Sequence, residues 1–139
     1  MGKVGMKMMY RQSKEFTKKD LEDLFLSVDW SSGHYPDKLV VAMKNSATVL
    51  SAWDGGKLVG LANALDDGIM TAYVHYVLVH PDYQGAGIGK ALLTQMREIY
   101  KDYLRIVLVS YNSEIGFYEG LGFVESKECA PMMLTSLWT

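Results

Sequence analysis

Apolar and polar residues follow their clearest pattern between positions 72 and 100. Residues 72–79 are almost all apolar or aromatic, which predicts a β-strand. Apolar side chains then recur every three or four residues and predict a helix that runs to residue 100: Ile88, Leu92, Met96 and Ile99. Residues 84–90, between the two, contain three glycines. Because a glycine-rich turn at a helix start exposes backbone N–H groups, this stretch predicts a site for phosphate or a similar anion.

The same reading predicts an alternation of strands and helices along the rest of the chain. Further strands are expected at residues 7–12, 48–53, 58–65 and 103–110, directly after Gly122, and at 132–137. Further helices are expected at residues 21–28 with Thr17 as N-cap, at 37–44, and at 114–120 with Asn112 or Ser113 as cap.

The order β-α-α-β-β-β-α-β-α-β-β is typical of an α+β fold. We expect a mixed, mostly antiparallel sheet of six to seven strands with about four helices on its faces. The length of 139 residues predicts a single domain spanning residues 1–139.

Composition narrows the functional classes. Apolar residues make up 49% of the chain and the net charge is −2, so the chain is globular and has no basic excess for nucleic acid. No apolar run has the length of a membrane span, and residues 1–10 lack the apolar core of a signal peptide. With Cys129 as its single cysteine, the chain is expected to form no internal disulfide and to be cytoplasmic. We expect no metal site.

Two familiar glycine loops do not match residues 84–90. A dinucleotide loop needs a third glycine where this chain has Lys90 or Leu92, and a P-loop needs Ser or Thr where it has Ala91. The pattern that fits is Gln-x-x-Gly-x-Gly, after a strand and before an apolar helix. With Phe-Tyr-x-x-x-Gly-Phe at residues 117–123, it resembles the GNAT superfamily of N-acetyltransferases over nearly the whole chain.

The resemblance implies the GNAT acyltransferase fold and acetyl-coenzyme A as the acetyl donor. In that family the strand before the loop splays from its neighbour, and strand backbone holds the pantetheine arm, which here implies Val77, Leu78 and Val79. The loop that would hold the pyrophosphate is Gln84, Gly85, Ala86, Gly87, Ile88, Gly89 and Lys90. Lys90 either neutralises the phosphates or is a solvated helix lysine. Asn112 is a further cofactor candidate, one residue nearer the Phe-Tyr pair than the family's asparagine.

Two residues are candidates for proton transfer. Tyr118 matches the family's general acid, which would protonate the departing thiol, and its alternative role is core packing. His75 matches a histidine position of the arylalkylamine acetyltransferases, and the alternatives for it are a general base or a structural histidine. Strand alternation places Tyr73, His75, Val77 and Val79 on one face.

The acceptor is expected to be a primary amine. An arylalkylamine is favoured because the loop predicted at residues 29–36, after the first helix, is aromatic. Trp30, Tyr35 and Tyr73 are the candidate substrate-binding residues, with core packing as the alternative for each. Three short segments also resemble plant and cyanobacterial-type serotonin acetyltransferases: Trp-Ser in this loop, Lys-Asn-Ser before the second predicted strand, and Tyr-Gln-Gly at the glycine loop. A polyamine, aminosugar or protein amine is an alternative acceptor, and a non-catalytic acyl-coenzyme A binding module is an alternative function. A homodimer is also expected.

Overall fold

The structure is a computed structural model and describes residues 8–139, so Lys7 of the first predicted strand lies outside the described residues. Its strands are β1 (Met8–Gln12), β2 (Thr48–Asp54), β3 (Lys57–Asp66), β4 (Thr71–Val79) and β5 (Arg105–Leu108). Its helices are α1 (Lys18–Ser27), α2 (Pro36–Asn45), α3 (Ile88–Ile99) and α4 (Ile115–Glu119). Short 3₁₀ turns lie at η1 (Ser31–His34), η2 (Pro81–Tyr83) and η3 (Asn112–Glu114).

The strands form one sheet in the order β1-β2-β3-β4-β5. The three pairs formed by β1 to β4 are antiparallel, whereas β4 and β5 pair in parallel. The parallel pair follows from the chain order, because α3 carries the chain back along the sheet between the two strands. The predicted α+β class and the mixed, mostly antiparallel sheet are therefore confirmed.

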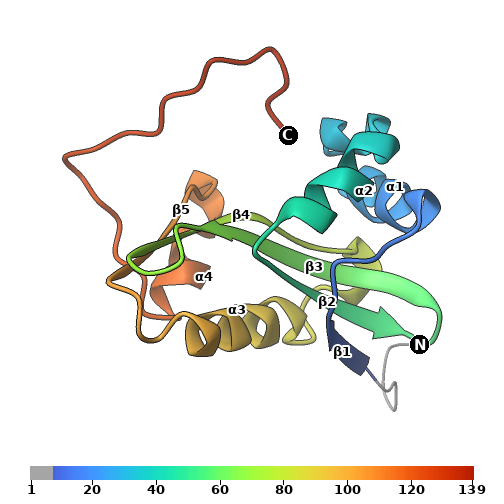
Figure 1. Cartoon of the computed structure of the whole chain (residues 1–139), viewed down its shortest axis with the longest axis horizontal. Helices are drawn as coiled ribbons and strands as arrows, with labels where there is room; N and C mark the ends of the chain where they lie inside the picture. The colour runs from blue at the N-terminus through green and yellow to red at the C-terminus, as the bar shows by residue number, and fades with distance from the viewer. Residues whose placement is uncertain (1–7) are drawn as a thin grey trace.

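Helices cover both faces of the sheet (Figure 1). The face under α3 buries the apolar stripe predicted from sequence, with Ile88, Leu92 and Met96 almost fully enclosed. The opposite face carries α1 and α2 and a separate buried cluster that includes Phe25. The α1 start is capped as predicted, because the Thr17 hydroxyl accepts a hydrogen bond from Asp20 N at 3.1 Å. The sheet is thus held between two apolar layers.

A β-bulge interrupts β4. His75 and Tyr76 stand against the single β3 residue Asn63, whose side-chain oxygen accepts from Tyr76 N at 2.8 Å. The predicted common face of Tyr73, His75, Val77 and Val79 is wrong for this reason, since an extra residue reverses the alternation beyond it. Val77 and Val79 pack toward α3, together with Ala72 and Val74 from before the bulge.

The sheet opens just after the bulge. β4 pairs with β5 only along residues 71–74, against 105–108, so residues 77–79 continue without a strand on that side among the described residues. β5 is correspondingly shorter than the predicted strand at 103–110. The opening is the splay that the family resemblance implied.

The two last predicted strands, after Gly122 and at residues 132–137, are wrong, and the sheet has five strands rather than six to seven. α4 ends as expected near Gly122, whose φ is +96°. The following residues leave the sheet, and apolar side chains there are exposed: Val124, Met132 and Leu134. A run of Met and Leu is compatible with a strand, but a strand forms only where an edge pairs with it. The predicted cap of α4 is also absent, since neither Asn112 nor Ser113 caps a helix through its side chain.

Candidate active site

The glycine loop turns sharply before α3. Gly85 and Gly87 both have φ of +83°, a left-handed conformation that favours glycine, and Gly87 is the N-cap of α3. A Cβ at either position would meet no atom within 4 Å, so the space over the loop is open. The first N–H groups of α3 have no partner within the helix and lie beside this open space. The loop therefore leaves room for the phosphate group that its sequence predicts.

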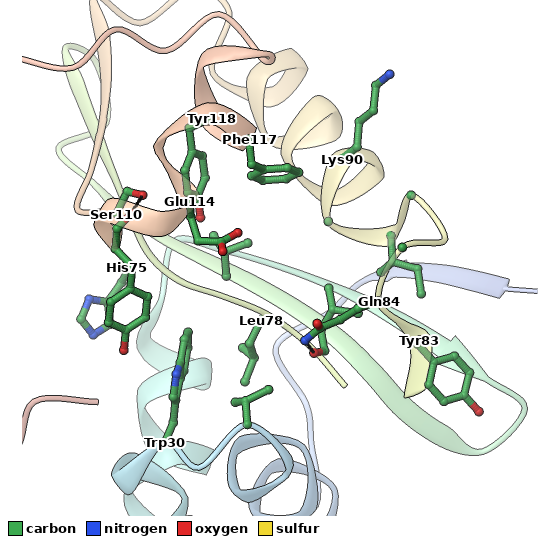
Figure 2. Close-up of a pocket in the computed structure, with 18 of the residues that line it drawn as sticks. Trp30, His75, Leu78, Tyr83, Gln84, Lys90, Ser110, Glu114, Phe117 and Tyr118 are labelled. Carbon is green, nitrogen blue, oxygen red and sulfur yellow. Dashed lines mark hydrogen bonds between the residues drawn. The ribbon is translucent and has the colours of Figure 1, made fainter. Parts of the chain in front are cut away.

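A cavity of about 590 Å³ runs from this loop to the opening between β4 and β5 (Figure 2). Most of the predicted site residues line it: Trp30, His75, Val77, Leu78, Val79, Gln84, Gly85, Gly87, Ile88, Gly89, Lys90 and Tyr118. The structure thus brings together residues that lie almost 90 positions apart in the chain.

Four predicted site residues lie elsewhere. Ala86 and Asn112 belong to the elements around the cavity but do not line it. Tyr35, at the start of α2, lines neither this cavity nor the second one described below. Tyr73 lines only the second of the two cavities.

Gln84 and Lys90 differ in what their side chains do. Gln84 Nε2 donates a hydrogen bond to the Val79 carbonyl at 3.0 Å, which ties the loop to the end of β4. The Lys90 side chain extends away from the cavity in Figure 2. In this arrangement Lys90 resembles the solvated helix lysine more than a phosphate partner.

Tyr118 lies across the cavity from the loop, on α4. Its ring packs edge-on against Phe117 and Phe123, at 5.0 and 5.8 Å between centroids. Burial, and secondarily the negative charge of Glu114, raise the pKa of Tyr118 to about 12. The phenol therefore keeps its proton at neutral pH.

Glu114 is a site residue that the sequence analysis missed. It lines the cavity and points toward Tyr118 in Figure 2. It is also the only carboxylate among the described residues that line either cavity. A signal was present in the sequence, since Glu114 stands four residues before Tyr118 and would share a helix face with it.

His75 is placed by the bulge at the other end of the cavity. Its ring lies 4.1 Å from that of Tyr76, and Nδ1 is 3.1 Å from the Tyr73 hydroxyl. These rings remove part of its surface from water, and this burial lowers the pKa of His75. The imidazole is therefore neutral at neutral pH and has a nitrogen that can accept a proton.

A second cavity, of about 530 Å³, meets the first. Both are lined by Trp30, His75, Val109, Ser110 and Tyr111. The second is lined in addition by residues of η1 and β4 and by part of the segment 133–139. His75 thus stands at the junction of a cavity that fits phosphate and a cavity rich in aromatic rings.

Neither a metal centre nor a membrane helix is found in the described part of the chain. No three His, Cys, Asp or Glu side chains of residues 8–139 gather as metal ligands would. Within the same residues, no helix combines the length and apolar character needed to cross a membrane.

A mixed sheet that opens beside a glycine loop defines the fold class of the acetyltransferases, and comparisons with known proteins agree. The family model "Acetyltransferase (GNAT) domain" matches residues 45–125. The chain resembles the GNAT-family acetyltransferase of Streptococcus pneumoniae TIGR4 in structure, with a TM-score of 0.80 and 25% identity over 94% of this chain and 98% of that one. The chain belongs to the GNAT family of N-acetyltransferases.

Two relatives show how far the sequence similarity extends. The chain is 32% identical over 133 residues to the uncharacterised N-acetyltransferase ycf52 of Pyropia yezoensis, covering 91% of this chain and 76% of that protein. It is 33% identical over 122 residues to Histone acetyltransferase TAP1 of Glycine max, covering 78% of this chain. The chain spans about half of that second protein, with 52% covered.

Proposed function

We propose that the protein transfers an acetyl group from acetyl-coenzyme A to a primary amine. One observation carries the proposal: the cavity beside the glycine loop and the aromatic cavity meet at His75, with Tyr118 lining the first. Two substrates bound in the two cavities would be adjacent only at this junction. A module that merely bound acyl-coenzyme A would not need the second cavity.

Main-chain groups of the protein would bind acetyl-coenzyme A. The N–H groups of the loop and of the first turn of α3 would hold the pyrophosphate, since Gly85 and Gly87 leave open space above them. Residues 77–79 would offer main-chain groups to the pantetheine arm, because β5 does not pair with them. When bound, acetyl-coenzyme A supplies a thioester whose acetyl carbon forms the new C–N bond as the C–S bond breaks.

Protons would then move at two side chains. His75, neutral at physiological pH, would accept the proton that the attacking amine loses, directly or through water. Tyr118, which keeps its proton, would donate it to the departing sulfur. The thiol of coenzyme A and the acetylated amine are the products.

An arylalkylamine is the acceptor we favour. The second cavity is lined by the rings of Trp30, Tyr73, Tyr76, Tyr111 and Trp138. Apolar rings gain about 25 cal/mol per Å² of buried surface, whereas a polycation must be desolvated. A polyamine or aminosugar site would need carboxylates, and Glu114 alone supplies one among the described cavity residues.

A protein amine is the second candidate acceptor. The observation that favours it is the similarity to a relative whose name describes a histone acetyltransferase. Acceptance of a lysine side chain on a protein would require the aromatic cavity to be open on its outer side.

A homodimer and a cytoplasmic location complete the proposal. The outer edge of β5 has no strand partner among the described residues, which leaves room for a second copy. Cys129 is a free, exposed thiol that suits a reducing compartment. Light scattering would show twice the chain mass of 15.6 kDa for a dimer.

The central experiment is a panel of amines incubated with protein and acetyl-coenzyme A. Thiol release should depend on the amine, and mass spectrometry should find an acetylated product. 2-Phenylethylamine or tryptamine should be better substrates than spermidine or an aminoglycoside. Thiol release that no amine accelerates would contradict the proposed function, and a preference for polyamines would contradict the arylalkylamine part alone.

A further inference from the structure

We propose that residues 124–139, here called the strap, form a latched outer wall of the acceptor cavity, and that Ser31 and Ser32 hold the latch. The latched wall admits small primary amines and excludes a lysine carried on a peptide. This inference rests on the proposed function and assigns its specificity to three residues: Ser31, Ser32 and Thr139.

The latch is a cluster of hydrogen bonds on one residue. The Thr139 main-chain oxygen accepts from Ser31 Oγ, Ser32 Oγ and Ser32 N, each at 2.8 Å. Thr139 Oγ1 accepts from Ser31 N at 2.8 Å and lies 2.9 Å from Ser31 Oγ. Both side-chain hydroxyls and both main-chain N–H groups of the serine pair are thus directed at Thr139.

The rest of the strap has no such attachment. For residues 124–138, each hydrogen bond and ion pair in the described structure joins two residues of the strap itself. Met132 is 92% exposed and Leu134 is fully exposed. In Figure 1 the strap leaves α4, arches away from the sheet and returns toward the end of the molecule that carries α1 and α2. Its position therefore depends mainly on the latch.

The strap is nevertheless part of the acceptor cavity. Six of its residues line that cavity: Met133, Leu134, Thr135, Leu137, Trp138 and Thr139. They share this cavity with the candidate base, since His75 also lines it. With the latch closed, the strap occupies the room that the main chain of a peptide acceptor would need.

The latch also touches the catalytic side of the cavity. Ser32 is 6% exposed, and its Oγ lies 2.9 Å from the Tyr76 hydroxyl as well as against the strap. The Tyr76 ring in turn packs at 4.1 Å on His75. A closed latch therefore completes the surroundings of His75, while an open one exposes the cavity.

The fraction of molecules with an open latch limits the apparent affinity for a bulky acceptor. A minor conformation is typically populated at roughly 0.1–10%, and a ligand that needs it binds more weakly by that fraction. Removal of the latch should therefore raise the apparent affinity for a peptide acceptor by about tenfold or more. A small amine, which fits the closed cavity, gains nothing.

The test is the double variant Ser31→Ala with Ser32→Ala, which weakens the latch by removing both hydroxyl donors and keeps its two main-chain hydrogen bonds. kcat/KM for a peptide with one lysine among neutral residues should rise about tenfold or more, while KM for 2-phenylethylamine rises because a wall is lost. A matched control is Ser13→Ala with Ser27→Ala, which removes one hydroxyl after β1 and one at the end of α1. Both hydroxyls hydrogen-bond locally, so the control should change the kinetics of neither substrate. Thr139→Val should shift both values in the same direction, by less, and remains informative if the double variant does not fold.

Limited proteolysis with chymotrypsin tests the latch without acetyl-coenzyme A or amine. Cleavage at Leu134, Leu137 and Trp138 should be faster in the double serine variant than in the parent and the control. Equal cleavage would overturn the latch. Faster cleavage with an unchanged preference between peptide and small amine would overturn the assignment of specificity. A parent protein with no amine-dependent thiol release would overturn the proposed function and its specificity, while cleavage would still decide whether the latch exists.

Discussion

Tyr118 and His75 owe their candidate roles to surroundings that act on them in opposite directions. Partial withdrawal from water favours the uncharged form of any titratable group, so it raises the pKa of the phenol and lowers that of the imidazole. At neutral pH the first side chain therefore carries a proton and the second is an uncharged imidazole that can accept one. A donor and an acceptor of protons lie along the same cavity before any substrate arrives.

Replacement of Tyr118 by Phe tests the donor. The ring packing against Phe117 and Phe123 is kept and the proton is lost, so kcat should fall by about 10²–10⁴-fold while the donor still binds. Stopped-flow or steady-state thiol release measures the change. Tyr35→Phe is the control, because Tyr35 lines neither cavity and should leave kcat unaltered. A Tyr118→Phe enzyme within twofold of the parent would show that this residue only packs.

Replacement of His75 by Gln tests the acceptor of the amine proton. Because burial lowers the pKa of His75, kcat/KM should rise with pH through an apparent pKa below the ordinary value of about 6.5. The sign follows from the role: the protonated imidazole formed at lower pH cannot act as a base. The His75→Gln variant should lose this rise of kcat/KM with pH, whereas His34→Gln should keep it. If the same rise with pH persists in His75→Gln, the base is water or another group.

Secondary-structure elements, rather than isolated side chains, form the candidate anion site at the start of α3. Gly87 combines a left-handed φ with open space, and a side chain there would both strain the turn and fill that space. Gly68 is a matched position, with φ of +86°, open space around it and no place in either cavity. A comparison of substitutions at Gly87 and Gly68 therefore distinguishes the effect of backbone strain from the effect of a blocked site.

Gly87→Val should therefore abolish the rise in Tm that acetyl-coenzyme A causes by binding the native state. Gly68→Val should lower the Tm of the free protein by a similar strain but keep the ligand-induced rise. Differential scanning fluorimetry with increasing acetyl-coenzyme A measures both. An undiminished rise in a folded Gly87→Val protein would contradict the assignment of the loop.

The sequence predicted an element correctly where the local pattern of residues determines it. It failed where the structure depends on pairing with a distant strand. The spacing of apolar residues in α3 and the glycines before it are local signals, and both predictions agree with the structure. The bulge at His75 and Tyr76 is not local, since it exists only relative to Asn63 on β3. The same holds for residues 132–137, which are suited to a strand but find no edge to pair with.

The site shows the same division. The family resemblance assigned Gly87 to the pyrophosphate and Tyr118 to the departing thiol, and both residues line one cavity. Glu114 was missed because no motif marks it, and its closeness to Tyr118 depends on how η3 joins α4. No local pattern marks Ser31 and Ser32, because their partner Thr139 lies more than 100 residues away in the chain.

The whole molecule divides its apolar residues between two enclosed layers and an exposed strap. Leu92 is fully buried on the sheet-facing side of α3, whereas Leu134 is fully exposed on the strap. The same substitution at the two positions tests that division. Leu92→Ala should cost about 2–5 kcal/mol of unfolding free energy. Leu134→Ala should change it by no more than about 0.5 kcal/mol. Urea unfolding followed by circular dichroism measures both, and equal losses would contradict the enclosed layers or the exposed strap.

The meeting of two cavities at one histidine also has a consequence for kinetic order. Under the proposed function each substrate would occupy its own cavity, so neither would have to leave before the other enters. The acetyl group would then never need to be attached to the protein. Cys129, the single thiol of the chain, lines neither cavity. Reciprocal plots of rate against one substrate at fixed levels of the other should therefore intersect rather than run parallel. Every turnover would then require a ternary complex, and the rate would respond to the supply of both the activated acetyl group and the amine.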